Sequence, residues 1–116
     1  MTPKDRLFLL ERPFLDPAFP GQKFYCWQCS LLEGVLSGFP SCAARLDVHR
    51  IAWGKPRAAL IERLGQDHQS APVLIFDKGG PSPENAKYAN GFAYVDDLFA
   101  ILDLLAVRHG FPAAHP

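Results

Sequence analysis

The sequence predicts an α/β fold built on a mixed sheet of four strands. Continuous apolar runs at 6–11 and 70–76 are typical of buried strands. Apolar residues between and after them recur at helical spacing, so the predicted order is strand, helix, strand, helix, strand, strand, helix. Strand–helix–strand units place two strands parallel through a right-handed crossover. We expect the last two strands, which are joined by a loop, to run antiparallel.

Length and composition limit the class of protein. At 116 residues the chain is long enough for one domain, residues 1–116, with a single core. Lys and Arg number 12, as do Asp and Glu, so no net charge favours nucleic acid or an anionic membrane surface as a partner. No apolar run is long enough for a membrane span or a signal peptide. We therefore expect a cytoplasmic protein.

The elements can be placed from local signals. The first helix should run from about Cys26 to 37–38, where Gly38 and Pro40 end it. Strands are expected at 45–53 and 91–95, and a second helix at about 56–64. The last helix should begin after the acidic pair 96–97, which caps it, and end at Gly110. Residues 12–23 and 77–90, interrupted by Pro and Gly, are predicted to be loops.

The first helix carries the main chemical signal, a Cys-x-x-Cys motif. Cys26 is predicted just before or at the helix start, with Cys29 one turn inside. The first N–H groups of a helix have no intrahelical partner, and this end of the helix dipole is positive. A thiolate at Cys26 would be stabilised there and would be the better nucleophile. Cys29 would lie close enough to form a disulfide with it or to resolve a mixed one.

A metal site is one alternative interpretation of these cysteines. Cys26 and Cys29 with Cys42 and His49 would supply the four ligands that zinc prefers. However, the second half of this set lacks a paired spacing, and a helix would carry Cys42 about 15–20 Å from Cys26. We therefore predict no metal site and interpret Cys42 as a bystander thiol. Inert cysteines remain a further alternative, and His68 and His109 are expected at the surface.

Three local matches indicate a resemblance to a known superfold. Residues 23–29, Lys-Phe-Tyr-Cys-Trp-Gln-Cys, resemble the Lys-x-x-Cys-x-x-Cys of dithiol glutaredoxins, and 70–73, Ser-Ala-Pro-Val, resemble their Thr-Val-Pro segment with its cis proline. Residues 96–98, Asp-Asp-Leu, resemble the acidic pair that starts their last helix. With the element order, these matches resemble the thioredoxin superfold, nearest its glutaredoxin branch, with a central mixed four-stranded sheet and helices on both faces. Residues 26–40 also resemble an uncharacterised bacterial thioredoxin-like family, DUF3088.

The resemblance implies thiol–disulfide exchange. Cys26 would be the nucleophile and Cys29 the resolving thiol. A cis Ala71–Pro72 bond would face them and leave the Ala71 backbone free to pair with an extended peptide. The substrate would be a protein or glutathione disulfide, with glutathione as a candidate co-substrate and no cofactor required. We expect a monomer or a weak homodimer.

Four more residues are candidates for substrate binding, each with a plainer alternative. Lys23 could hold a substrate carboxylate or favour the thiolate, or be a solvated loop lysine. Trp27 could offer a flat surface to a substrate or be a partly buried anchor. Asp97 could receive a ligand ammonium while Asp96 caps the last helix, or both could serve only as caps.

Two other functions stay open from the sequence. The chain could be a thioredoxin-fold module that binds a protein partner, without turnover, through the Cys26–Pro72 cleft and the Pro-rich loop 12–23. It could also be a glutaredoxin-like domain that binds zinc or an iron–sulfur cluster.

Overall fold

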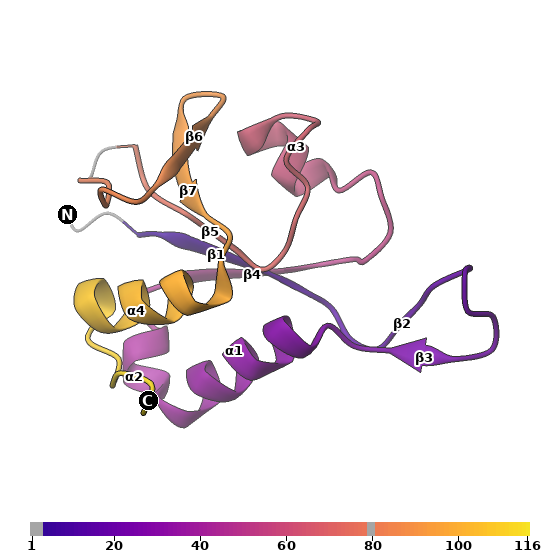
Figure 1. Ribbon diagram of the computed structural model, residues 1–116, viewed down its shortest axis with the longest axis horizontal. Helices are drawn as coiled ribbons and strands as arrows, with labels where there is room; N and C mark the ends of the chain where they lie inside the picture. The colour runs from indigo at the N-terminus through magenta and orange to yellow at the C-terminus, as the bar shows by residue number, and fades with distance from the viewer. Residues whose placement is uncertain (1–3, 79–80) are drawn as a thin grey trace.

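The computed structural model describes residues 4–78 and 81–116, and within these ranges the chain forms a five-stranded mixed sheet with helices (Figure 1). The strands of this sheet are β1 (Arg6–Leu10), β4 (Asp47–Ile51), β5 (Val73–Ile75), β6 (Lys87–Ala89) and β7 (Phe92–Val95). They lie in the order β4-β1-β5-β7-β6. The β1–β4 pair is parallel, and the other neighbours are antiparallel. The mixed sheet, the parallel pair of the first strand–helix–strand unit and the antiparallel last pair are therefore confirmed. The second strand–helix–strand unit is not parallel, because β4 and β5 lie on either side of β1 and run in opposite directions.

The predicted number of strands is wrong, because β6 lies inside the segment 77–90 that was expected to be a loop. β6 and β7 form a hairpin whose turn is Asn90-Gly91, and both residues have positive φ, 51° and 81°. An Asn-Gly pair favours the tight two-residue turn that matches the twist of adjacent strands. β6 is only three residues long, so it shows no alternation that would reveal it.

A second small sheet lies in the other expected loop, residues 12–23. β2 (Phe14–Leu15) and β3 (Lys23–Phe24) pair antiparallel, and the hairpin they form extends away from the main sheet (Figure 1). Its base is fixed by aromatic contacts. The Phe14 ring stacks on Trp53 with centroids 5.3 Å apart and lies 6.3 Å from Phe24.

The helices are α1 (Trp27–Gly38), α2 (Pro40–Ala43), α3 (Ala58–Leu64) and α4 (Leu98–His109). α1 and α4 agree with the predicted ranges, α3 begins two residues later than expected, and the single turn α2 was not predicted. Asp97 caps α4 by accepting a hydrogen bond from the Ala100 N–H at 3.0 Å. Gly110 ends α4 with φ 75°, a left-handed conformation that glycine adopts without steric cost.

The three inner strands of the sheet, β1, β5 and β7, are mostly buried, whereas the edge strands β4 and β6 are not. α1, α2 and α4 lie on one side and α3 on the other (Figure 1). Alternate residues of β1 point to opposite sides, so Leu7 and Leu9 pack with α1 and α4, whereas Phe8 packs with Leu60 and Leu64 of α3. This explains why β1 is a continuous apolar run. None of the helices described is long and apolar enough to cross a membrane.

A buried ionic cluster joins the two ends of the chain. The carboxylate of Asp5 is 1% exposed, and it accepts hydrogen bonds from Arg108 Nε at 2.9 Å and Arg108 Nη2 at 3.2 Å. His109 Nε2 lies 2.7 Å from Asp5 Oδ2. The expectation that His109 lies at the surface is wrong, because this carboxylate holds the ring in the interior. Burial raises the pKa of Asp5, but the hydrogen bonds from His109 and Arg108 outweigh it and hold the pKa below its ordinary 3.8.

We predict that Asp5→Asn lowers the free energy of unfolding by about 3–5 kcal/mol at pH 7, because Arg108 loses its buried partner. The pKa of Asp5 is lower in the folded chain than in the unfolded chain. Its ionised form therefore stabilises the fold above pH 3.8, and this contribution is lost as the pH falls below that value. Urea unfolding at pH 7 and pH 3 measures both effects.

The control for this prediction is Asp103→Asn, an exposed carboxylate on α4, which should change stability by less than about 0.5 kcal/mol. An Asp5→Asn variant as stable as the parent at pH 7 would contradict the role given to this cluster.

Candidate functional site: a dithiol at the start of α1

Cys26 is the N-cap of α1, as predicted. Its backbone is extended, with φ −78° and ψ 116°, and its Sγ accepts a hydrogen bond from the Cys29 N–H at 3.3 Å. The side chain is half-buried. Because a helix N-terminus presents unpaired N–H groups and a positive dipole end, this sulfur lies where negative charge is stabilised.

Cys29 lies one turn further and is buried, with 2% of its surface exposed. Its Sγ accepts a hydrogen bond from the Leu10 N–H, at the carboxyl end of β1, at 3.4 Å. Burial raises the pKa of Cys29 to about 12, against an ordinary value of 9.0. The hydrogen bond from Leu10 opposes this shift, and the neighbouring Cys26 adds to it. Both cysteines are free thiols, one partly accessible and one protonated and enclosed.

The Ala71–Pro72 peptide bond is cis, as predicted. Pro72 is buried directly before β5, and Ala71 is half-buried. Ala71 and Cys26 pack against the same core cluster, which contains Cys29. Two further cis bonds, Arg12–Pro13 and Lys55–Pro56, lie in the segments that follow β1 and β4.

Arg57 is a charged residue of the site that sequence reasoning missed. Its guanidinium donates to the Trp53 carbonyl from Nε at 2.9 Å and Nη2 at 2.7 Å, and to the Gln69 carbonyl from Nη1 at 2.7 Å. Burial lowers the pKa of Arg57, and electrostatic attraction to Cys29 and Cys26 opposes that shift. A partly buried cation is therefore fixed within electrostatic range of both sulfurs. No sequence pattern reveals it, because its two carbonyl partners come from separate loops.

Glu33 is the second residue that was missed. It lies one turn after Cys29 on α1 and accepts a two-pronged hydrogen bond from Arg50 of β4, at 2.8 and 2.7 Å. Arg12 Nη1 donates to the same carboxylate at 2.7 Å. The hydrogen bonds from Arg50 are the main cause that lowers the pKa of Glu33, against the opposing effect of burial. Glu33 thus fixes α1 to the edge strand and to the start of the hairpin.

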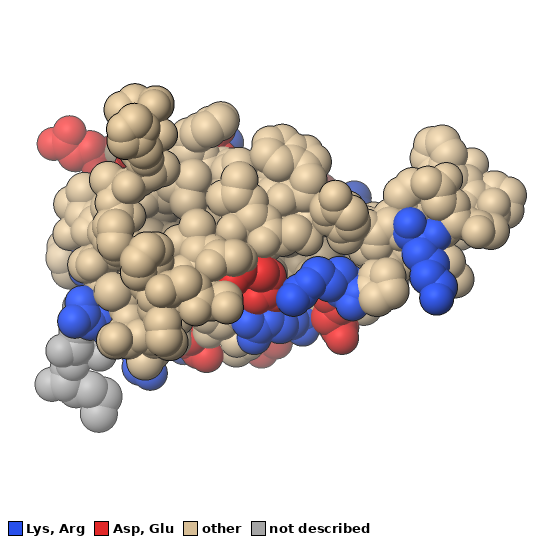
Figure 2. Space-filling model, turned by 90° about the horizontal axis from the view of Figure 1, so that it is seen from below, with Lys and Arg blue, Asp and Glu red and all other residues tan. Residues whose placement is uncertain are grey.

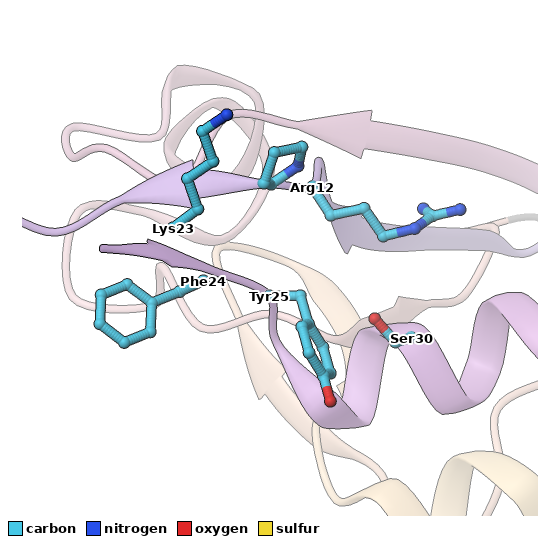
Figure 3. A pocket seen from close by; sticks show the side chains of 6 residues that line it. Arg12, Lys23, Phe24, Tyr25 and Ser30 are labelled. Atoms are coloured by element: carbon cyan, nitrogen blue, oxygen red, sulfur yellow. The ribbon is translucent and has the colours of Figure 1, made fainter. Parts of the chain in front are cut away.

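A groove of about 570 Å³ lies between the hairpin and the first turns of α1. Its lining residues are Arg12, Pro13, Lys23, Phe24, Tyr25 and Ser30. Lys23 and Phe24 extend from opposite sides of β3 (Figure 3). The sequence candidate Lys23 therefore borders an open, mainly apolar groove, and two other lining residues, Tyr25 and Ser30, precede and follow Cys26 in the chain. Trp27, the next candidate, is 60% exposed at the first position of α1.

The acidic pair before α4 has structural partners. Asp97 is the N-cap, whereas Asp96 pairs with Lys87 of β6 at 2.9 Å. The expectation that Asp96 caps the helix is therefore wrong, since Asp97 has this position. Asp96 lines a cavity of about 40 Å³ together with His68 and Tyr94, and this cavity shares no lining residue with the groove beside Cys26.

Cys42 takes no part in the dithiol. Its thiol donates to the Gly110 carbonyl at 3.4 Å, so it lies beside the end of α4. Across residues 4–78 and 81–116, no three His, Cys, Asp or Glu side chains are close enough together to hold a metal ion.

The fold and this site define a small α/β protein with a Cys-x-x-Cys dithiol at the carboxyl end of a parallel strand pair. The chain belongs to DUF3088, a family described as "Protein of unknown function", whose model matches residues 4–113. No curated protein and no solved structure matches the chain.

We predict that iodoacetamide at pH 8 modifies Cys26 long before Cys29. With a pKa of about 12, only about one Cys29 thiol in 10,000 is ionised at this pH, and the thiolate is the reactive form. Mass mapping of peptides after timed quenching gives both rates.

The same reaction in denaturant is the control, because unfolding removes the burial and both thiols should then react at similar rates. Equal rates for Cys26 and Cys29 in the folded protein would contradict this assignment.

Proposed function

We propose that this protein is a thiol–disulfide oxidoreductase with Cys26 as the nucleophile and Cys29 as the resolving thiol. The observation that carries the proposal is the position of Cys26 Sγ, which caps α1 and accepts the N–H of Cys29 at 3.3 Å. The sulfur of Cys26 is half-buried, so a substrate can approach it. The thiol of Cys29 is buried and stays protonated until it attacks the mixed disulfide.

Disulfide exchange would take place in two steps. The Cys26 thiolate attacks one sulfur of a substrate disulfide, and the other substrate sulfur leaves as a thiolate. Cys29 then loses its proton to the departing thiolate or to water and attacks Cys26 Sγ, which breaks the mixed disulfide. Two electrons pass from the two protein thiols to the substrate, and an intramolecular disulfide remains. A cellular thiol, with glutathione as the candidate, returns the protein to its dithiol form and is itself oxidised to a disulfide.

The arrangement of the sheet supports this proposal. The order β4-β1-β5-β7, with β4 parallel to β1 and the others antiparallel, is similar to that of the thioredoxin superfold, and β6 adds a strand at its edge. The cis Ala71–Pro72 bond before β5 agrees with the resemblance to the glutaredoxin branch. Substrates would be protein or glutathione disulfides, and the cytoplasm is the compartment that keeps such a dithiol reduced.

A second candidate is a module that binds a protein partner without turnover. The observation that favours it is the exposure of Tyr25, at 65%, and Trp27, at 60%, on either side of Cys26. Exposed aromatic side chains are enriched at binding surfaces. The two candidates differ in whether the dithiol reduces a disulfide.

We predict that Cys29→Ser, incubated with a disulfide substrate, accumulates a mixed disulfide at Cys26, because the resolving thiol is missing. Cys26→Ser should form none and should lose all reductase activity. Non-reducing electrophoresis followed by mass spectrometry identifies the linked residue.

The matched control is Cys42→Ser, which removes the third thiol without touching the site and should retain activity. Turnover that survives in Cys26→Ser, or a mixed disulfide that forms on Cys29 instead, would refute the assigned roles.

We predict that Arg57→Met slows the alkylation of Cys26 at pH 7 by about three- to tenfold. An opposite charge within reach favours the ionised form of a thiol, and this substitution removes that charge. Stopped-flow alkylation of a Cys42→Ser background measures the rate.

Arg63→Met, a substitution of another part-buried arginine on α3, should leave this rate unchanged. A fall of the same size in Arg63→Met would show that the effect is structural and not electrostatic.

A further inference from the structure

Large apolar side chains are exposed on the β2–β3 hairpin and at the start of α1, the helix that carries the dithiol. Several that are at least 40% exposed belong to the hairpin or to the start of α1, namely Leu15, Phe19, Tyr25, Trp27 and Leu31. Apolar surface gathered in this way marks an interaction site more often than a surface that stays in water. The patch includes residues on both sides of Cys26 along the chain.

The hairpin, which carries Leu15 and Phe19 of this patch, is held in place by contacts between aromatic rings. Phe14 stacks on Trp53 at 5.3 Å, and the Phe19 ring meets Phe24 edge-on at 5.6 Å. Phe24 in turn lines the groove beside Cys26. A braced surface loses little conformational entropy when a partner binds, so it suits docking.

The groove is lined by basic residues and by no acidic one. Its two charged lining residues, Arg12 and Lys23, are both basic. Arg12 is engaged by Glu33 at 2.7 Å, whereas no ion pair joins Lys23 to any residue that the structure describes. Figure 2 shows the protruding end as mostly uncharged surface with a basic patch and, in that view, no acidic side chain. The groove therefore has an unpaired cation beside an apolar floor.

We propose that this groove docks a polypeptide substrate in which an acidic residue and an apolar residue flank the disulfide. The proposal rests on the function proposed above and adds the class of substrate. The acidic side chain pairs with Lys23, and the apolar one covers Phe24 and Tyr25. A polypeptide fits better than a small thiol compound, because the apolar side chains extend from the hairpin along the first two turns of α1.

The test uses two short peptides that differ only in charge. Each carries one cysteine flanked by leucine and by either glutamate or lysine, and each is linked through a disulfide to 2-mercaptoethanol. Reduced protein is mixed with peptide in single turnover, and each rate is divided by that for bis(2-hydroxyethyl) disulfide, which is uncharged. This ratio cancels any effect of a substitution on the sulfur chemistry itself.

We expect the acidic peptide to react about tenfold faster than the basic one at low salt, and the difference to shrink at high salt. Lys23→Glu should remove or reverse the preference. Lys4→Glu is the matched control, because Lys4 is an exposed lysine that precedes β1 and does not line the groove. This variant should preserve the preference for the acidic peptide.

A binding experiment keeps the inference separate from the proposed function. The same peptides with serine in place of cysteine are titrated against the protein, with the fluorescence of exposed Trp27 as the signal. Tighter binding of the acidic peptide that weakens in Lys23→Glu supports the groove even if no reduction occurs. Equal binding of both peptides, or binding of glutathione alone, overturns the inference. Inactivity towards the uncharged disulfide overturns only the proposed function.

Discussion

The contact between the end of β1 and the first turn of α1 determines the geometry of the site. The Leu10 N–H donates to Cys29 Sγ, and Leu32 on the next turn is buried in the same core. Because these contacts turn one side of α1 towards the sheet, Cys29 is enclosed. Cys26, three residues earlier, is left at the helix end with its sulfur partly accessible. The different environments of the two thiols follow from how one helix docks on one strand.

Two sets of arginine contacts hold the surroundings of this helix in place. Arg50 of β4 and Arg12 both bind Glu33, which fixes the middle of α1 to the edge of the sheet and to the hairpin. Arg57 bridges the carbonyls of Trp53 and Gln69 and thereby joins the loop after β4 to the segment that leads to Pro72. The loops beside the dithiol are thus held by guanidinium groups as well as by apolar packing.

The sequence was sufficient for the features that depend on local patterns. The cap at Cys26 and the extents of α1 and α4 follow from residues within one or two turns of each other, and the structure agrees. The cis bond at Pro72 was expected from the resemblance to the glutaredoxin branch, and it is present. Strands of two or three residues, such as β2, β3 and β6, are too short for periodicity to reveal them. The pair Asn90-Gly91 does indicate a hairpin, but it was overlooked because residues 77–90 were expected to be a loop.

The residues that sequence reasoning missed depend on partners far along the chain. Arg57 owes its position to carbonyls 4 and 12 residues away in different loops, and Glu33 owes its position to a strand 17 residues later. His109 is buried by a carboxylate 104 residues earlier. Apart from the contact of Arg57 with Trp53, these contacts arise only when the tertiary structure brings separate segments together, so a window of one or two turns does not contain them.

The same separation has a consequence for how the protein is made. Asp5 is synthesised well before its partners, because Arg108 lies 103 residues and His109 104 residues later in the chain. Until they emerge, the strand β1 that follows Asp5 cannot seat this carboxylate in the interior at low cost. Completion of the fold is therefore delayed until α4 has been synthesised, and a nascent chain that stalls before α4 ends would carry an unneutralised acid directly before β1.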